Sequence, residues 1–277
     1  MKSHDQLDMV IASVRASPKY RAVSPDLVRE VAARELAKRP GANAKEAIKA
    51  TKNKLHQIAG VYLDVKPDYD AWLAEIARAA AQGAPAALRT ACRDVLRHHA
   101  STRERLPILD QFYAATLARI PPPRRVLDLA CGLNPLALPW LPLAPGATYT
   151  AYDIYTDLAD FLAASFEHLR AAGLPLAATD AAVRDILHDP PQEPADLALL
   201  LKAIPCLEQI DPDAGRRLLH TLNATHLLVS YPVASLGGRG KGMAVTYEAR
   251  FHALVADTPW TIQRYAFPTE LAFLITK

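Results

Sequence analysis

The sequence predicts an α/β protein in which an all-helical N-terminal domain precedes a Rossmann-like sheet of five parallel strands and a C-terminal antiparallel hairpin. Two patterns carry this prediction. Apolar residues recur at helical spacing through the first hundred residues. Later in the chain, short apolar runs alternate with helical segments, which is typical of parallel strands joined by crossover helices. With 277 residues the chain is long enough for two domains, which we expect at 1–100 and 101–277.

Helix signals dominate residues 4–63. Ser24 followed by Pro25 is an N-cap with proline at the first helical position. Asn43 and Glu46, three residues apart, form a capping-box pattern in its asparagine variant. We therefore expect a helix to start at each of these two points.

Two more helices are expected within 68–99, separated by the Gly-Ala-Pro break at 83–85. A second capping box, Ser101 with Glu104, predicts a helix that begins there and runs to about residue 120. Three consecutive prolines then end it, because proline removes a backbone donor and disrupts the helical turn.

From this point strands and helices alternate. Helices are expected near 135–141, 157–172 and 211–222, and two closely spaced strands at 260–267 and 271–276 form the closing hairpin. The five expected parallel strands are 125–130, 148–154, 176–185, 196–204 and 226–231.

Positive charge is concentrated in the first sixty residues. They hold twelve Lys and Arg against six Asp and Glu, although the whole chain carries only +3. Lys45, Lys49 and Lys52 share one face of a predicted helix. Such a face is often simply solvated, but a basic module on a mildly acidic body also suits a polyanionic partner. A glycine-rich loop carrying Arg239 and Lys241 suits phosphate contacts as well.

Cysteines, histidines and apolar runs exclude several classes of protein. Cys92, Cys131 and Cys206 show neither CxxC spacing nor a disulfide framework, so we expect buried thiols. The nine histidines form no metal-binding pattern, and no GxSxG nucleophile motif occurs. No apolar run reaches eighteen residues and the first residues lack a signal-peptide core. We expect a cytoplasmic protein with neither a membrane span nor a metal.

The segment LDLACGLNP at 127–135 joins the first strand to a helix with a single glycine, Gly132. A pyrophosphate requires a glycine-rich turn at a helix N-terminus, so this loop disfavours a dinucleotide. Asp153 ends the second strand about twenty residues later, where a carboxylate can bind a ribose diol. Asp185 and Ile186 end the third strand and suit the amine and the ring face of an adenine.

These features favour S-adenosylmethionine, which combines adenine and ribose with an amino acid and carries no phosphate. Its carboxylate needs a cation or a helix N-terminus, and the stretch Ser101–Arg105 at the start of the helix before the first strand offers both. Arg105 could make a forked contact with that carboxylate. Asp128, which starts the loop, is either a ligand contact or a buried hydrogen-bond acceptor. Lys202 leaves an otherwise apolar strand and must reach water, a ligand or a carboxylate, because burying it unpaired is costly.

Four further segments stand out in the sequence: HASTRERLP at 99–107, LACGLNPLA at 129–137, LLLKAIPCLE at 199–208 and SLGGRGKGM at 235–243. They resemble the aminoglycoside-resistance methyltransferases that act on guanine nitrogen-7 in 16S ribosomal RNA. The likeness spans nearly the whole chain and includes SPKYRAVSPDLVRE near its start. It implies an S-adenosylmethionine-dependent methyltransferase sheet, one methyl transfer to a guanine in the decoding site of the assembled small (30S) subunit, and an N-terminal domain that docks on folded 16S rRNA.

The resemblance also implies roles for individual residues. Arg105 would hold the methionine carboxylate, Asp153 the ribose, and Asp185 with Ile186 the adenine. Gln209 stands for a family glutamine whose spacing differs by a residue or two. The implied rRNA contacts are Lys45, Lys49, Lys52, Arg239 and Lys241. The implied cofactor pocket consists of Tyr62, His99, Ala100, Ser101, Arg105, Ala130, Gly132, Asp153, Asp185, Ile186, Leu201 and Gln209.

The implied chemistry requires no general base, since guanine nitrogen-7 carries a lone pair and no proton. We therefore expect no acid–base residue, and a protein that positions the reactants, desolvates them and extrudes the base. Lys202 is expected to contact an acceptor atom or a phosphate of the target. Tyr152 or Tyr231 is placed to stack on the flipped guanine.

Three alternatives compete with this interpretation. An adenine-specific enzyme acting on the same rRNA helix is the nearest, and a non-catalytic RNA-binding ribosome assembly factor comes from a different class. A nicotinamide dehydrogenase is the generic interpretation of a doubly wound sheet, but the GxGxxG motif is missing.

Overall fold

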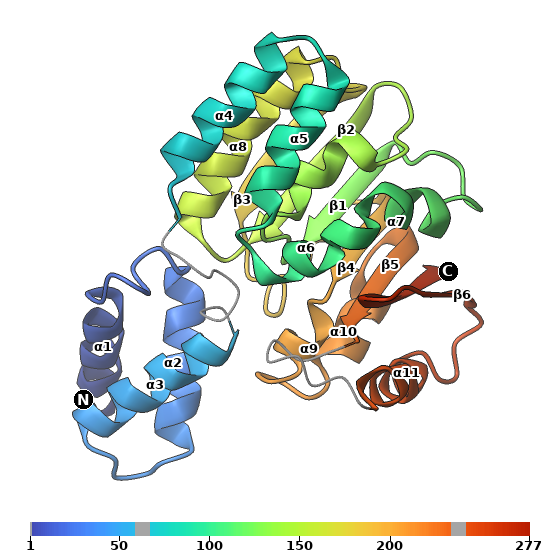
Figure 1. Ribbon diagram of the computed structural model, residues 1–277. Helices are drawn as coiled ribbons and strands as arrows, with labels where there is room; N and C mark the ends of the chain where they lie inside the picture. Colours follow the sequence, from blue (N-terminus) through green and yellow to red (C-terminus); the bar gives the residue numbers. More distant parts are fainter. Residues whose placement is uncertain (1, 59–66, 234–241) are drawn as a thin grey trace.

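The computed structural model describes residues 2–58, 67–233 and 242–277 (Figure 1). Three helices form an N-terminal module: α1 (Lys2–Arg15), α2 (Pro25–Ala37) and α3 (Ala44–Ile58). Their apolar faces share a core of their own, which includes Val14, Val28 and Leu55. The helices therefore form because each buries one stripe against the other two.

The caps expected for these helices are only partly formed. Pro25 is the first residue of α2, but the Ser24 side chain makes no capping hydrogen bond. The Asn43 box is confirmed: the Glu46 amide donates to Asn43 Oδ1 at 3.0 Å, and the Asn43 amide donates to Glu46 Oε2 at 3.1 Å.

The rest of the described chain is built on a seven-stranded sheet with the order β3-β2-β1-β4-β5-β7-β6. The first five strands pair in parallel, and the last two form an antiparallel hairpin on β5, as expected. The chain moves outward from β1 in both directions, so the switch point lies between β1 and β4. The strands are β1 (Arg125–Leu129), β2 (Ala147–Asp153), β3 (Leu176–Val183), β4 (Ala195–Leu201), β5 (Ala224–Pro232), β6 (Thr261–Ala266) and β7 (Glu270–Thr276).

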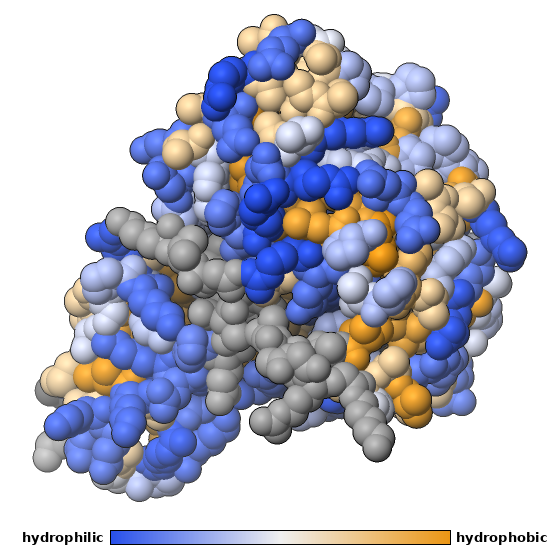
Figure 2. Space-filling view, in the orientation of Figure 1, coloured by the Kyte–Doolittle hydropathy of each residue, from blue (hydrophilic) through white to orange (hydrophobic). Residues whose placement is uncertain are grey.

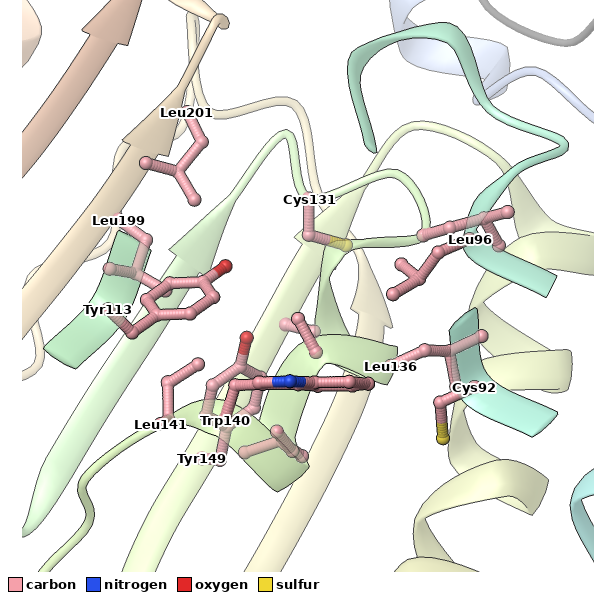
Figure 3. Packing of buried hydrophobic residues seen from close by; sticks show 14 of the residues in the cluster. Cys92, Leu96, Tyr113, Cys131, Leu136, Trp140, Leu141, Tyr149, Leu199 and Leu201 are labelled. Atoms are coloured by element: carbon pink, nitrogen blue, oxygen red, sulfur yellow. The ribbon is translucent and has the colours of Figure 1, made fainter. Parts of the chain in front are cut away.

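Apolar cores cover both faces of this sheet, since side chains alternate along each strand. Leu199 and Leu201 of β4 point to one face with Leu136 and Tyr149, as Figure 3 shows, whereas Leu200 points to the other. The first face is covered by α4 (Tyr69–Ala81), α5 (Pro85–Leu96), α7 (Leu109–Thr116), η2 (Asn134–Trp140) and α8 (Thr156–Ala171). The second is covered by α9 (Ile204–Leu207), α10 (Ala214–Thr221) and α11 (Met243–Leu254).

The division expected at residue 100 does not coincide with the division between the cores. Helices α4 and α5 pack on the sheet domain beside α8 (Figure 1). Tyr69 stacks on Phe161 at 4.8 Å between ring centroids, and Trp72 meets the same ring edge-on. The apolar stripes of both helices therefore belong to the body, whereas the described helices α1, α2 and α3 share the other core.

The helix expected from Ser101 to residue 120 is broken. It is divided into α6 (Ala100–Arg105), a single 3₁₀ turn η1 (Leu106–Ile108) and α7, since Pro107 cannot continue the hydrogen-bond ladder. The predicted capping box is also wrong. The N-cap is His99, and the Glu104 carboxylate accepts from Lys202 Nζ at 2.8 Å.

Candidate active site

A pocket opens at the carboxyl edge of the sheet, where parallel α/β folds bind ligands. It encloses about 940 Å³ of atom-free space, a figure that includes open solvent at its mouth. The lining comes from the ends of β1 to β4 and from helices α2, α4, α6, α8 and α9. Of the expected cofactor residues, those lining the pocket are His99, Ser101, Ala130, Gly132, Asp153, Asp185, Ile186 and Leu201.

Gly132 is required for two separate reasons. Its φ of +51° lies in the left-handed region that favours glycine. In addition, a Cβ at this position would lie 2.9 Å from two atoms of the His99 ring. The single glycine of the loop thus lets the imidazole pack directly on the backbone.

Asp153 organises this loop as well as lining the pocket. Its Oδ2 accepts from the Gly132 amide at 2.8 Å, and its Oδ1 accepts from the Ile154 amide at 2.7 Å. Burial raises the pKa of Asp153, and these amide donors counteract the effect. The loop amide that would face a pyrophosphate in a dinucleotide site therefore points at a protein carboxylate.

Asp185 is oriented by its own turn. Its Oδ1 accepts from the Leu187 amide at 3.0 Å, and its Oδ2 lies 2.8 Å from His188 Nδ1. Ile186 beside it is buried and apolar. A carboxylate next to an apolar wall can take an exocyclic amine and cover the adjoining ring, as expected from the sequence.

Arg105 is not part of the pocket lining. Its Nη2 donates to Glu270 Oε1 at 2.7 Å and its Nε to Glu270 Oε2 at 3.0 Å. Its Nη1 donates to Asn134 Oδ1 at 2.6 Å. Among the described residues, these contacts engage all three guanidinium nitrogens, so the expected contact with a methionine carboxylate would have to be added to this buried network.

Lys202 directly follows β4 and has a left-handed backbone, φ +60°. Its ammonium donates to the Ser101 carbonyl at 3.0 Å and to Glu104 at 2.8 Å, and it lies 3.4 Å from Glu270 Oε2. The lysine therefore reaches carboxylates, one of the destinations that the sequence left open. Its positive charge is offset within the protein.

His99 is held neutral by its surroundings. Burial, together with the nearby charges of Lys202 and Arg105, lowers the pKa of His99 to about 4. Its Nδ1 lies 3.2 Å from Ser101 Oγ. A neutral ring can pack on Gly132 without bringing a further charge to the pocket.

Asp128 proves to be a buried hydrogen-bond acceptor. It receives the Tyr149 hydroxyl at 2.6 Å and Asn134 Nδ2 at 2.8 Å, and burial raises its pKa to about 7. Asn134 also contacts Arg105, so the network extends from β1 to the first residue of β7.

Comparison with known proteins shows the family of this chain. A family model described as ribosomal RNA methyltransferase (FmrO) matches residues 16–274. A protein of Micromonospora echinospora named 16S rRNA (guanine(1405)-N(7))-methyltransferase is 37% identical, covering 99% of this chain and 97% of its own. One of the same name from Serratia marcescens is 36% identical, covering 96% and 97%. The chain belongs to this ribosomal RNA methyltransferase family.

Solved structures agree with this assignment. The 16S rRNA methyltransferase RmtF in complex with S-adenosyl-L-homocysteine superposes on this methyltransferase with a TM-score of 0.80 at 33% identity, covering 98% of each chain. The 16S rRNA methylase RmtB gives a TM-score of 0.75 at 33% identity, also covering 98% of each.

Several expected site residues of the methyltransferase lie elsewhere. Ala100 is buried outside the pocket lining, and Gln209 is exposed. Tyr62, Arg239 and Lys241 fall outside the described residues, so the structure leaves those expectations as they stand.

The structure places both suggested stacking tyrosines outside the pocket lining. The Tyr231 ring is 1% exposed and stacks on Tyr247 within the core. The Tyr152 ring lies under the Arg184 guanidinium, and its hydroxyl donates to Glu193. Neither lines the pocket. Both look suitable in sequence because they stand near strand ends, which does not reveal the direction of the side chain.

Other pocket residues of the methyltransferase were missed. Tyr69 and Leu158 come from helices that cover the sheet, Cys206 and Ile210 follow β4, and Leu27 comes from the N-terminal module. The apolar pattern around these residues indicates burial in the core and does not distinguish a core position from a pocket wall. None of the three cysteines forms a disulfide. Cys92 and Cys131 are buried as expected, whereas Cys206 is only half-buried because it lines the open pocket.

The sequence predicted neither a metal site nor a membrane span. Within residues 2–58, 67–233 and 242–277, no cluster of three potential metal ligands occurs. The same part of the chain holds no helix long and apolar enough to cross a bilayer.

Proposed function

We propose that this rRNA methyltransferase transfers the methyl group of S-adenosylmethionine to nitrogen-7 of guanine 1405 in 16S rRNA, and thereby confers aminoglycoside resistance. The observation that carries the proposal is the similarity to five relatives that are named for guanine-1405 nitrogen-7 methylation. They are 36–40% identical to this chain, which covers 84–97% of their lengths. The assembled 30S subunit in the cytoplasm is the proposed setting.

The chemistry of the pocket fits this cofactor. Asp153 would accept from the ribose hydroxyls, and Asp185 with Ile186 would hold the adenine. Leu133 and Leu201 would surround the remainder of the nucleoside with apolar surface. When bound, the cofactor supplies an electrophilic methyl group on a sulfonium.

The protein's contribution is positioning rather than proton transfer. Guanine nitrogen-7 has no proton to lose, so no pocket residue has to act as a base. Methylation leaves the guanine with a positive charge. Lys202 is the lysine that lines the described pocket, and its positive charge is paired with Glu104 and Glu270. This pairing reduces the repulsion between Lys202 and the positively charged product.

The N-terminal module provides the proposed rRNA-docking surface. Lys45 and Lys49 are exposed on α3, and the module's outer surface in Figure 2 is largely hydrophilic. Lys52 is half-buried, and its Nζ donates to Ser17 Oγ at 2.6 Å, so it also ties α3 to the segment after α1. Lys45 and Lys49 are therefore the residues of this face best placed for phosphates.

Methylation of purified small subunits tests the proposal. The enzyme is incubated with 30S subunits and radiolabelled S-adenosylmethionine, and the modified base is mapped by cleavage at 7-methylguanine. We expect one methyl group per subunit, at guanine 1405. Label on an adenine would favour the adenine-specific alternative, and absence of both cofactor binding and methylation would favour the non-catalytic assembly factor.

A further inference from the structure

The N-terminal module is joined to the cofactor pocket by backbone hydrogen bonds. The Ser24 amide donates to the Ile154 carbonyl at 2.7 Å, and the Thr156 amide donates to the Ala22 carbonyl at 2.9 Å. These bonds form an isolated antiparallel bridge between the segment before α2 and the residues directly after Asp153. The carboxylate proposed for the ribose is thus one residue from the junction.

A side chain of the module also forms part of the pocket wall. Leu27, in the first turn of α2, is 1% exposed and lines the pocket beside Ile154 and Ile210. These two body residues are among the few that pack on the module's core. The apolar wall is therefore made from both sides of the junction.

A third link reaches the carboxylate proposed for the adenine. His188 presents Nδ1 to Asp185 at 2.8 Å, and its Nε2 lies 3.4 Å from Arg34 Nη2 on α2. Arg34 Nη1 also donates to the Ile210 carbonyl at 3.3 Å. Helix α2 consequently contacts a neighbour of each carboxylate at the nucleoside end of the pocket.

From these three links we infer that α2 completes the cofactor pocket, with Leu27 a pocket residue and Ser24 a positioning residue for the segment after Asp153. Correct packing of the N-terminal module on the body then favours cofactor binding. A second consequence rests on the proposed function. If the same module docks on rRNA, the cofactor and the subunit raise each other's affinity by the same factor, as thermodynamic linkage requires.

Substitutions at Ser24 isolate the backbone link. Ser24→Pro removes the donor to Ile154, and the native φ of −43° has the sign that proline requires, although it lies just outside the usual proline range. Ser24→Ala keeps the amide and loses no capping bond. Titration with S-adenosylhomocysteine by calorimetry should show about two- to tenfold weaker binding for Ser24→Pro, the range of one hydrogen bond, and wild-type binding for Ser24→Ala. Equal affinity of the two folded variants would overturn the inference.

A second pair keeps the test decisive if Ser24→Pro does not fold. Leu27→Ala and Val31→Ala both truncate buried side chains of α2, but only Leu27 lines the pocket. We expect about tenfold or greater loss of S-adenosylhomocysteine affinity for Leu27→Ala and less than about twofold for Val31→Ala. Equal losses in the two variants would show that α2 acts only through general stability.

The coupling is measured with wild-type enzyme and 30S subunits. Subunit affinity should rise when S-adenosylhomocysteine is saturating. Unchanged subunit affinity would remove the coupling while leaving the proposed function in place. Failure to bind subunits under any condition would instead contradict the proposed function, and the cofactor titrations above would still decide whether α2 completes the pocket.

Discussion

Arg105 and Glu270 form a forked ion pair inside the protein, with 2.7 Å between Nη2 and Oε1 and 3.0 Å between Nε and Oε2. Both side chains are almost completely buried. Burial alone would raise the pKa of Glu270, but the charges of Arg105 and Lys202 outweigh it and hold that pKa below its usual value. One carboxylate therefore anchors two cations beside the pocket.

Replacing Glu270 by alanine should be strongly destabilising, because it leaves a buried guanidinium and a buried ammonium short of a partner. We expect a loss of about 3–5 kcal/mol in the free energy of unfolding, measured in urea. Glu248→Ala is the matched control, since it breaks an exposed pair with Arg264 and should cost about 0–1 kcal/mol. Similar losses in the two variants would mean that the buried pair has no special weight.

Gly132→Ala separates steric contact from backbone strain when it is compared with Gly146→Ala. Both glycines have positive φ, but only at Gly132 would the new Cβ meet another side chain, the His99 ring. Gly146→Ala should cost about 1–2 kcal/mol through strain alone. Gly132→Ala should cost at least about 1 kcal/mol more and weaken S-adenosylhomocysteine binding. Unfolding curves and calorimetry provide the two measurements, and indistinguishable variants would refute the packing role of His99.

Asp153→Asn should weaken S-adenosylhomocysteine binding by about 10- to 100-fold, the range for losing hydrogen bonds to a charged group. The amide retains one acceptor oxygen, so the loop should stay folded, as near-ultraviolet circular dichroism can check. Asp157→Asn, at an exposed carboxylate in the first turn of α8, should bind the ligand normally. Normal binding by Asp153→Asn would reject the ribose contact.

The neutral state of His99 predicts a pH dependence of stability. Its pKa of about 4 in the folded protein lies below the ordinary value of 6.5, so on acidification the unfolded chain takes up the proton first. The stabilisation that this difference represents is complete above pH 6.5 and is lost as pH falls towards 4. Between those limits wild type should lose up to about 3 kcal/mol more than His99→Gln in urea unfolding. Parallel curves for the two proteins would contradict the shift.

The exposed lysines of α3 should govern subunit binding without affecting the cofactor. Lys45→Glu with Lys49→Glu is expected to weaken 30S binding and flatten its salt dependence, since each phosphate contact contributes to that slope. Lys52 is left intact because it contacts Ser17. Arg78→Glu with Arg119→Glu makes the same charge change at positions of the body. Filter binding of subunits at several salt concentrations should separate the two pairs, and equal effects would point to net charge alone.

The sequence by itself determined that a sheet of five parallel strands and a closing hairpin forms, and it determined much of one side of the pocket. Strand periodicity, the single glycine and the acidic residues at strand ends are local features, so they were enough to assign Gly132, Asp153 and Asp185 to the pocket. Parallel strands bring their carboxyl ends to one edge, which is why residues distant in sequence could be assigned to a common site.

Tertiary structure decided the partners of the charged groups and the packing of the helices. Glu270 lies 165 residues from Arg105, and no spacing rule connects them. The apolar stripe of α4 shows that one face is buried, but not that it packs on α8 rather than on α3. Leu27 likewise enters the pocket only because α2 meets the segment after β2. Periodicity specifies which side of an element avoids water, whereas the surface that covers it depends on contacts between segments far apart in the chain.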